Sequence, residues 1–151
     1  MWLRTIYLAA IALAAISLAA DQAWALGFEL GETKEQLKLQ YDVSATDHRT
    51  GRVTINLTIA DEGRLKPLDR GVALVIPSQD KSGYVDLSVS LERRLENGKQ
   101  IVSVHLTREL AERGQIQLKT DTLDGKQQPL TWYYHVIPIA DYLKNVEPKK
   151  D

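Results

Sequence analysis

Cysteine is absent from the 151 residues of this chain. Its absence excludes disulfide bonds, cysteine-ligated zinc, iron–sulfur clusters and thiol nucleophiles. It also excludes a bacterial lipoprotein anchor, which needs a cysteine for lipid attachment. A domain of this size without disulfide bonds must be stabilised by the burial of its apolar side chains alone.

An excess of charge of either sign is also missing. Lys and Arg number 19 and Asp and Glu number 20, which gives a net charge of −1. Nucleic-acid binding normally needs a clearly basic face, so we expect no nucleic-acid partner. The basic residues form only three small clusters, at Arg49/Arg52, Arg64/Lys66/Arg70 and Arg93-Arg94. We interpret these clusters as solvated loop tips, and the alternative is a small contact for an anionic glycan or lipid headgroup.

The sequence motifs of the common enzyme classes do not occur. There is no Gly-x-Ser-x-Gly, no His-Glu-x-x-His and no glycine-rich phosphate loop. Of the three histidines, His48 falls in a turn. His105 and His135 fall on strands expected in different sheets, so we expect no shared metal ion. The sequence therefore predicts a non-enzymatic protein without metal or cofactor.

Loop carboxylates leave one enzymatic alternative open. Asp61-Glu62, and Asp121 with Asp124, have the chemistry for general acid–base catalysis by a hydrolase. They lie in turn sequences rich in glycine and charge, which favours a turn-forming role instead.

The first 25 residues have the pattern of a signal peptide. Arg4 supplies a positive charge, residues 5–20 form an apolar run, and Ala23-Trp24-Ala25 offers the small-x-small pattern of a cleavage site. We expect cleavage between Ala25 and Leu26 and a periplasmic or secreted protein. The alternative is a membrane anchor, but the run of 16 residues contains seven alanines and is short for a spanning helix of about 20 apolar residues.

Apolar and polar residues alternate through most of the remaining sequence, which is typical of half-buried strands. The expected strands cover residues 37–45, 53–59, 72–76 and 85–91, the segment from the Asn97-Gly98 turn to Leu106, residues 116–118, and residues 130–137. With one short helix between the fifth and sixth strands, this pattern predicts a seven-stranded antiparallel β-sandwich. The strand order is similar to that of immunoglobulin-like domains, without their paired cysteines.

We expect four segments along the chain. The sandwich spans residues 34–143 and is followed by a polar tail, residues 144–151. Residues 26–33 lie between the signal peptide and the sandwich as a lead-in. Gly27 and Gly31 suit either an extra edge strand or a flexible segment there, and the sequence leaves both open.

Two local predictions have a clear signal. Asn97-Gly98 predicts a tight hairpin, because both residues tolerate positive φ. In that register Leu91 faces Val104 and Val89 faces Leu106, with His105 pointing outward opposite Ser90. Residues 107–113, ended by Gly114, predict a helix of at most two turns that Thr107 caps.

The last expected strand contains Trp132-Tyr133-Tyr134-His135, and successive strand residues point to opposite faces. If Asp124-Gly125 forms a tight two-residue turn, Ile116 faces Tyr133, which leaves Trp132 outside. The exposed platform then consists of Trp132, Tyr134, Gln115, Gln117 and Lys119. Planar rings flanked by amides and a lysine suit a sugar ring or a peptide partner.

A loop longer by one residue reverses this arrangement. Trp132 and Tyr134 then enter the core, and Tyr133 and His135 lie outside. Burial of a tryptophan is worth about 2 to 3 kcal/mol and favours this second arrangement. The sequence leaves both alternatives open.

These observations predict an exported, non-enzymatic module that binds a protein or a cell-envelope glycan through a strand edge or the last-strand aromatics. The alternative is a carrier of a small hydrophobic ligand, which would need a cavity inside the sandwich. The sequence fixes neither the ligand nor the oligomeric state.

Overall fold

The computed structural model describes residues 28–48, 51–68, 70–78, 83–144 and 146. The expected signal peptide and its cleavage point lie outside these residues, as does most of the polar tail. The described chain is mostly β-strand, in sheets that do not close into a barrel. No described helix is long and apolar enough to cross a membrane.

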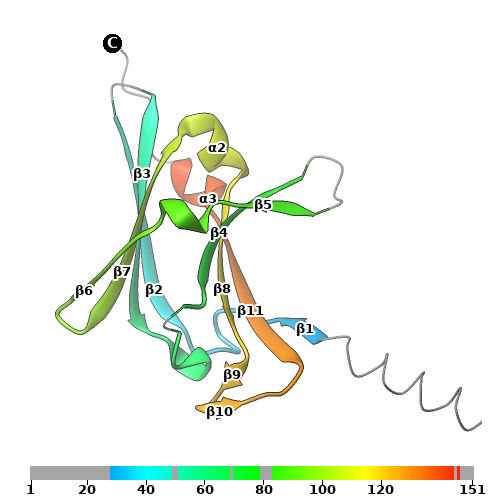
Figure 1. The fold of residues 1–151 in the computed structure, drawn as a ribbon. Helices are drawn as coiled ribbons and strands as arrows, with labels where there is room; N and C mark the ends of the chain where they lie inside the picture. Colours follow the sequence, from blue (N-terminus) through cyan, green and yellow to red (C-terminus); the bar gives the residue numbers. More distant parts are fainter. Residues whose placement is uncertain (1–27, 49–50, 69, 79–82, 145, 147–151) are drawn as a thin grey trace, which may run out of the picture.

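Five strands form the first sheet, called sheet A (Figure 1). Their order is β1 (Phe28–Gly31), β11 (Thr131–Pro138), β8 (Gln115–Thr120), β4 (Val72–Pro77) and β5 (Tyr84–Asp86). The pairs from β11 to β5 are antiparallel, but β1 runs parallel to β11. Part of the lead-in is therefore an edge strand, and the expectation of a purely antiparallel fold was wrong at this edge.

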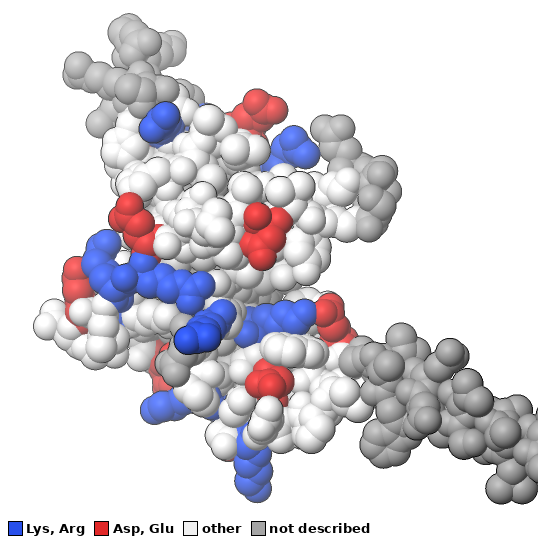
Figure 2. Space-filling view, in the orientation of Figure 1, with Lys and Arg blue, Asp and Glu red and all other residues white. Residues whose placement is uncertain are grey.

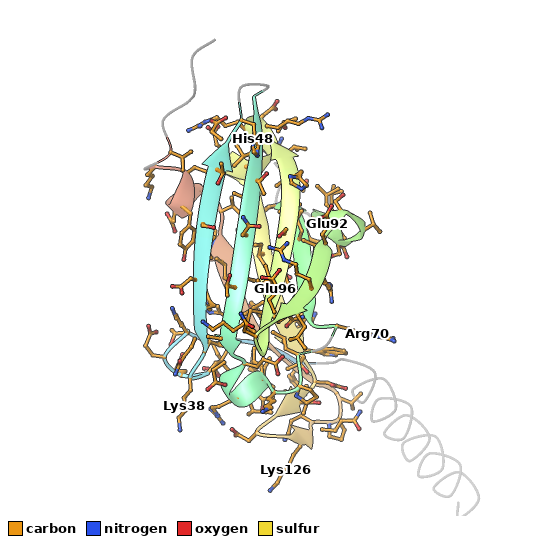
Figure 3. All side chains as sticks on the ribbon, turned by 90° about the vertical axis from the view of Figure 1, so that its left-hand side faces the viewer. Lys38, His48, Arg70, Glu92, Glu96 and Lys126 are labelled. Atoms are coloured by element: carbon orange, nitrogen blue, oxygen red, sulfur yellow. The ribbon has the colours of Figure 1, made fainter. Side chains whose placement is uncertain are left out.

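Four antiparallel strands form the second sheet, called sheet B. Their order is β2 (Gln40–Asp47), β3 (Arg52–Asp61), β7 (Lys99–Thr107) and β6 (Glu92–Glu96). Figure 3 looks onto this sheet, with Glu92 and Glu96 on the edge strand β6 and His48 at the end of β2. Alternate residues of β3 point inward, so Val53, Ile55 and Leu57 have no exposed surface.

A single apolar core joins the two sheets. It contains β3 and β7 residues from sheet B and β4, β8 and β11 residues from sheet A. β1 lies at the edge of sheet A, away from sheet B, and all four of its residues are exposed (Figure 1). The core therefore does not hold β1 in place, and its apolar side chains, Phe28 and Leu30, remain exposed.

The described residues also form short helices between strands and after the last strand. The predicted helix is confirmed as α2 (Arg108–Arg113), where the Thr107 side chain accepts from Leu110 N and Gly114 ends the last turn. A second helix, α3 (Ala140–Leu143), follows the proline that ends β11 and was not predicted. The 3₁₀ turn η1 (Gly63–Leu65) lies in the loop after β3.

The expected fourth strand is divided in the structure. β5 pairs with β4 in sheet A, the 3₁₀ turn η2 (Ser88–Ser90) follows, and β6 pairs with β7 in sheet B. The tight Asn97-Gly98 hairpin is confirmed, with Glu96 opposite Lys99. The pairing of Val89 with Leu106 was wrong and Leu91 lies outside the ladder with Val104, because the chain joins sheet B only at Glu92, opposite Ser103.

His105 points outward as predicted and lies opposite Thr54 of β3, but it does not face Ser90, because Ser90 lies in η2 and not in the β6–β7 ladder. The alternation in residues 85–91 reflects a crossing between sheets. Leu87 and Leu91 pack against the core on either side of η2, while Val89 is 97% exposed. An alternating apolar and polar sequence can therefore include a 3₁₀ turn and need not form one continuous strand.

A matched pair of Val→Ala variants tests this division. Val53→Ala removes methyl groups with no exposure and should lower the free energy of unfolding by about 2 to 3 kcal/mol. Val89→Ala should change it by less than about 0.5 kcal/mol. Urea unfolding measures both, and an equal loss in the two variants would contradict the division of the strand.

Candidate functional site

The predicted platform residues lie on one face of sheet A. In the β8–β11 ladder, Lys119 lies opposite Tyr134, Gln117 opposite Val136, and Gln115 opposite Pro138. Trp132 is two residues before Tyr134 and therefore shares its face. The structure thus brings Trp132, Tyr134 and Lys119 together at the β1 end and places Gln115 and Gln117 further along β8 on the same side.

Trp132 points away from the core and is 39% exposed. The alternative in which Trp132 and Tyr134 enter the core was wrong, because Tyr133 is the residue that packs against the core. The tight turn at Asp124-Gly125 is present, with both residues at positive φ. Extra residues between β10 and β11 then shift the β8–β11 pairing by an even number of positions, so that Ile116 lies opposite Ile137 rather than Tyr133. An even shift leaves each side chain on the face that the tight turn predicts.

Lys119 and Glu29 hold the Trp132 ring in place. The Lys119 Nζ atom lies 5.3 Å from the centre of the Trp132 ring and forms an ion pair with the Glu29 carboxylate. Glu29 lies directly beside Trp132 in the β1–β11 register. Sequence reasoning missed Glu29, because only the pairing of β1 with β11 brings it to this face.

Tyr134 lies against Gly31 of β1. A Cβ atom at Gly31 would lie 2.9 Å from the Tyr134 hydroxyl oxygen and 3.0 Å from Cζ. The missing side chain therefore makes room for the tyrosine ring, which covers the edge glycine. This contact shields one side of the Tyr134 ring and gives the residue a structural role beside any binding role.

A groove continues from the platform beyond the end of β1. Its volume is about 460 Å³, and the described residues that line it come from the loop after β1 and from β11: Gly31, Glu32, Thr33, Lys34, Glu35, Tyr134, His135 and Val136. Lys34 donates to the Tyr41 carbonyl and lies 4.2 Å from the centre of the Tyr41 ring. The cation of this groove is therefore held against β2, and the Glu32 and Glu35 side chains contribute negative charge.

His135 connects the two sheets below this groove. Its Nδ1 lies 3.0 Å from the Glu32 carbonyl oxygen and its Nε2 lies 2.8 Å from the Tyr41 hydroxyl. A carbonyl oxygen only accepts, so in neutral His135 the Nδ1–H donates and Nε2 accepts from Tyr41. Both ring nitrogens are occupied in this way, which gives His135 a role in fixing the loop after β1.

Burial raises the pKa of Tyr41 from 10.0 to about 12, with the neighbouring Tyr142 phenol and the Glu35 charge as further causes. The neutral phenol is the form that donates to His135. The folded state therefore binds this proton more tightly than the unfolded state does.

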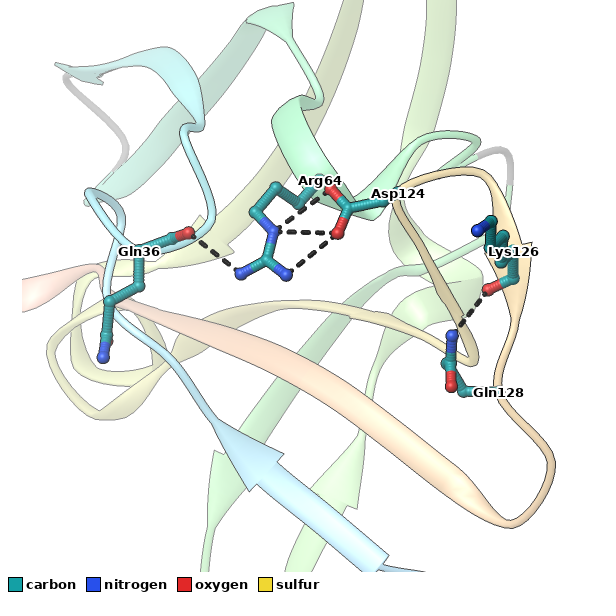
Figure 4. Close-up of polar contacts among 5 residues, drawn as sticks. All are labelled: Gln36, Arg64, Asp124, Lys126 and Gln128. Atoms are coloured by element: carbon teal, nitrogen blue, oxygen red, sulfur yellow. Dashed lines mark hydrogen bonds and ion pairs between the residues drawn. The ribbon is translucent and has the colours of Figure 1, made fainter.

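Arg64 of η1 fixes the turn between the short strands β9 (Thr122–Leu123) and β10 (Lys126–Gln127) (Figure 4). Its Nε and Nη2 atoms lie 2.9 to 3.1 Å from the Asp124 carboxylate oxygens. Hydrogen bonding to Arg64 lowers the pKa of Asp124, and the same contact raises the pKa of Arg64. The Asp124 backbone N–H also donates to the Arg64 carbonyl at 2.7 Å.

The other loop carboxylates also form turn contacts. Asp61 accepts from Gly63 N at 2.9 Å, and Asp121 accepts from the Thr122 hydroxyl and the Gln127 amide. Among the described residues, no cluster of three or more His, Asp or Glu side chains has the arrangement of a metal site.

Arg93 and Arg94 of the third basic cluster are tied to acceptors within the chain. Figure 2 shows Lys and Arg side chains gathered in a stripe across the middle of one face. Arg93 donates to the Val72 carbonyl at 2.6 Å, and Arg94 pairs with Glu96 at 2.7 Å. Arg49 lies outside the described residues. The contacts of Arg93 connect β6 with β4, so this cation helps to hold the two sheets together.

No known protein family matches this chain, and no curated protein matches it either.

The raised pKa of Tyr41 predicts a loss of stability at high pH. The contribution of this proton is fully present below pH 10.0 and is lost as the pH rises through about 12. The free energy of unfolding should therefore fall more steeply between these values in the wild-type chain than in Tyr41→Phe. Urea unfolding at a series of pH values measures the difference. Tyr84→Phe, at an exposed tyrosine, is the control and should parallel the wild type; parallel curves for Tyr41→Phe would refute the assignment.

Proposed function

We propose that this protein is an exported, non-enzymatic binding module of the cell envelope. The contact surface is the platform together with β1, and its ligand is a protein or a glycan. Export follows from the signal-peptide pattern of residues 1–25. The single observation that carries the binding proposal is the exposure of Trp132, whose ring is positioned by Lys119 and Glu29.

The distribution of exposed apolar side chains supports this proposal. Phe28 and Leu30 of β1 are 65% and 43% exposed, and Leu130 and Trp132 at the start of β11 are 45% and 39% exposed. These four residues belong to two paired segments. Trp132 shares its face with Glu29, whereas Phe28 and Leu30 point to the opposite face, so exposed apolar groups flank both faces of this edge. Exposed apolar groups gathered at one edge of a sheet are typical of a binding surface, whereas single exposed apolar residues are common on any protein.

The fold supports an immunoglobulin-like assignment, which we propose as the finer description of this sandwich. With β2, β3, β4, β6, β7, β8 and β11 taken as strands A to G, sheet B has the order A-B-E-D and sheet A contains G-F-C. β5 extends the G-F-C sheet as the additional strand of variable-type domains does. Sandwiches of this type serve many functions, so the assignment by itself names no ligand.

Trp132 fluorescence tests the proposed surface. The experiment uses the full chain with Trp2→Phe and Trp24→Phe, which leaves Trp132 as the one tryptophan. We expect red-shifted emission in the free protein and a blue shift when purified envelope polysaccharide or envelope protein is added, because binding removes water from the ring.

Retention on the immobilised envelope fraction that gives this shift provides the second readout. Trp132→Ala should weaken retention about tenfold or more, as expected for a central interface aromatic. Tyr84→Ala, an exposed aromatic of β5, is the matched control and should leave retention unchanged. Blue emission from the free protein, or no response to either fraction, would refute the proposed surface.

A further inference from the structure

The backbone of β1 presents an open edge. Phe28 N donates to the Leu130 carbonyl and Glu32 N donates to the Tyr134 carbonyl, at 2.7 and 2.9 Å. The direction of backbone groups alternates along a strand, so the N–H and C=O groups of Glu29 and Gly31 point away from β11. No described strand pairs with this side of β1.

The usual protection of an open edge is missing here. Edge strands are commonly protected by lysine, proline or inward-pointing charge. β1 has one charged residue, Glu29, and its carboxylate is engaged by Lys119. Phe28 and Leu30 alternate with it and share the opposite side of the strand. An added strand would place every second side chain beside these two exposed apolar residues.

The charge at the end of β1 completes the pattern. Glu32 follows β1 directly, and Glu35 lies on the same groove. Lys34 is turned to the Tyr41 ring and carbonyl. A strand antiparallel to β1 would bring its first residues to this groove, where a lysine or arginine complements the two glutamates.

We propose that an extended polypeptide segment adds to the open edge of β1 as a further antiparallel strand of sheet A. The segment carries a basic residue first and apolar residues at the next two alternate positions. This inference rests on the proposed binding function and names the partner class. The aliphatic and phenyl groups of Leu30 and Phe28 favour a peptide over a glycan, since neither offers a hydrogen bond to a hydroxyl.

The length of the edge favours a segment over a folded partner. Stable interfaces between folded proteins bury about 1,200 to 2,000 Å², and the four residues of β1 provide too little surface for such an interface. Strand addition obtains its affinity from main-chain hydrogen bonds and its specificity from alternate side chains. A second copy of this chain in the same antiparallel pairing would bring the start of its own β1, at Phe28, to this groove, and Phe28 offers no positive charge to Glu32 and Glu35.

The experiment uses a labelled capped hexapeptide, Lys-Thr-Val-Thr-Val-Thr, and the full chain with Trp2→Phe and Trp24→Phe. Fluorescence anisotropy of the label measures the dissociation constant. We expect saturable binding that weakens about tenfold or more when the lysine is replaced by glutamate. A second peptide carries proline at the second threonine and at the second valine, which removes two backbone N–H donors. We expect this peptide to lose at least as much affinity as the peptide with glutamate.

Two matched variants of the protein test the edge itself. Glu29→Pro removes the outward N–H and the ion pair, whereas Glu29→Ala removes the ion pair alone. We expect Glu29→Pro to weaken peptide binding at least tenfold relative to Glu29→Ala, with both variants folded by circular dichroism. Glu35→Lys should weaken binding of the lysine peptide, and Glu109→Lys on α2 should not.

The outcomes separate the two proposals. Trp132 emission that responds to envelope polysaccharide, with no binding of the peptide, would overturn strand addition and leave the proposed function standing. Peptide binding that is equal in Glu29→Pro and Glu29→Ala would also overturn strand addition. If the peptide does not bind and Trp132 emission responds to neither envelope polysaccharide nor envelope protein, both proposals are overturned.

Discussion

The pairing of β8 with β11 determines which side chains this protein presents. Thr122 pairs with Gln127 across the tight turn, but Thr120 pairs with Tyr133 further along. Thr120 and Thr122 are two residues apart, whereas their partners Tyr133 and Gln127 are six residues apart, so the β11 side contains four extra residues. An even excess leaves the faces unchanged, since side chains alternate with a period of two. Trp132 therefore lies outside.

Two features stabilise this arrangement. The bidentate contact of Arg64 with Asp124, from Nε to Oδ1 and from Nη2 to Oδ2, fixes the tight turn at its centre. The detour between the two ladders contains Leu130, a non-glycine residue at a φ of 59°. Its carbonyl accepts from Phe28 N, which begins the pairing of β1. The same detour that keeps Trp132 outside thus also provides the start of the edge strand.

Local signals made part of the fold predictable. The Asn97-Gly98 hairpin, the Thr107 cap and the all-β character followed from turn chemistry, capping and alternation, which depend on neighbouring residues. The division at η2 was not predictable from alternation. Leu87 and Leu91 pack against the core where the chain crosses between the sheets, so they give the same apolar pattern as residues of a strand. The partners of Trp132 were predictable only in part. Lys119 is on the neighbouring strand, but Glu29 reaches it through a parallel pairing over a long separation in sequence.

The two sheets present different surfaces. On the outer side of sheet B, Thr54 bonds to His48 and His105 at 2.7 and 2.8 Å, and Ser103 bonds to Asn56 at 2.6 Å. These polar groups satisfy one another. At the β1 edge of sheet A, apolar side chains and outward-pointing backbone groups remain exposed. This contrast between the polar face of sheet B and the β1 edge is the physical basis for proposing that sheet A binds the partner.

Disulfide trapping tests the ladder most directly, because the chain has no native cysteine to compete. Directly opposed residues of an antiparallel pair lie within disulfide range. The account predicts that Lys119→Cys with Tyr134→Cys forms a cross-link on mild oxidation, whereas Lys119→Cys with Tyr133→Cys does not. Cross-linking of Cys at 119 with 133 and not with 134 would place Trp132 on the other face and contradict the account.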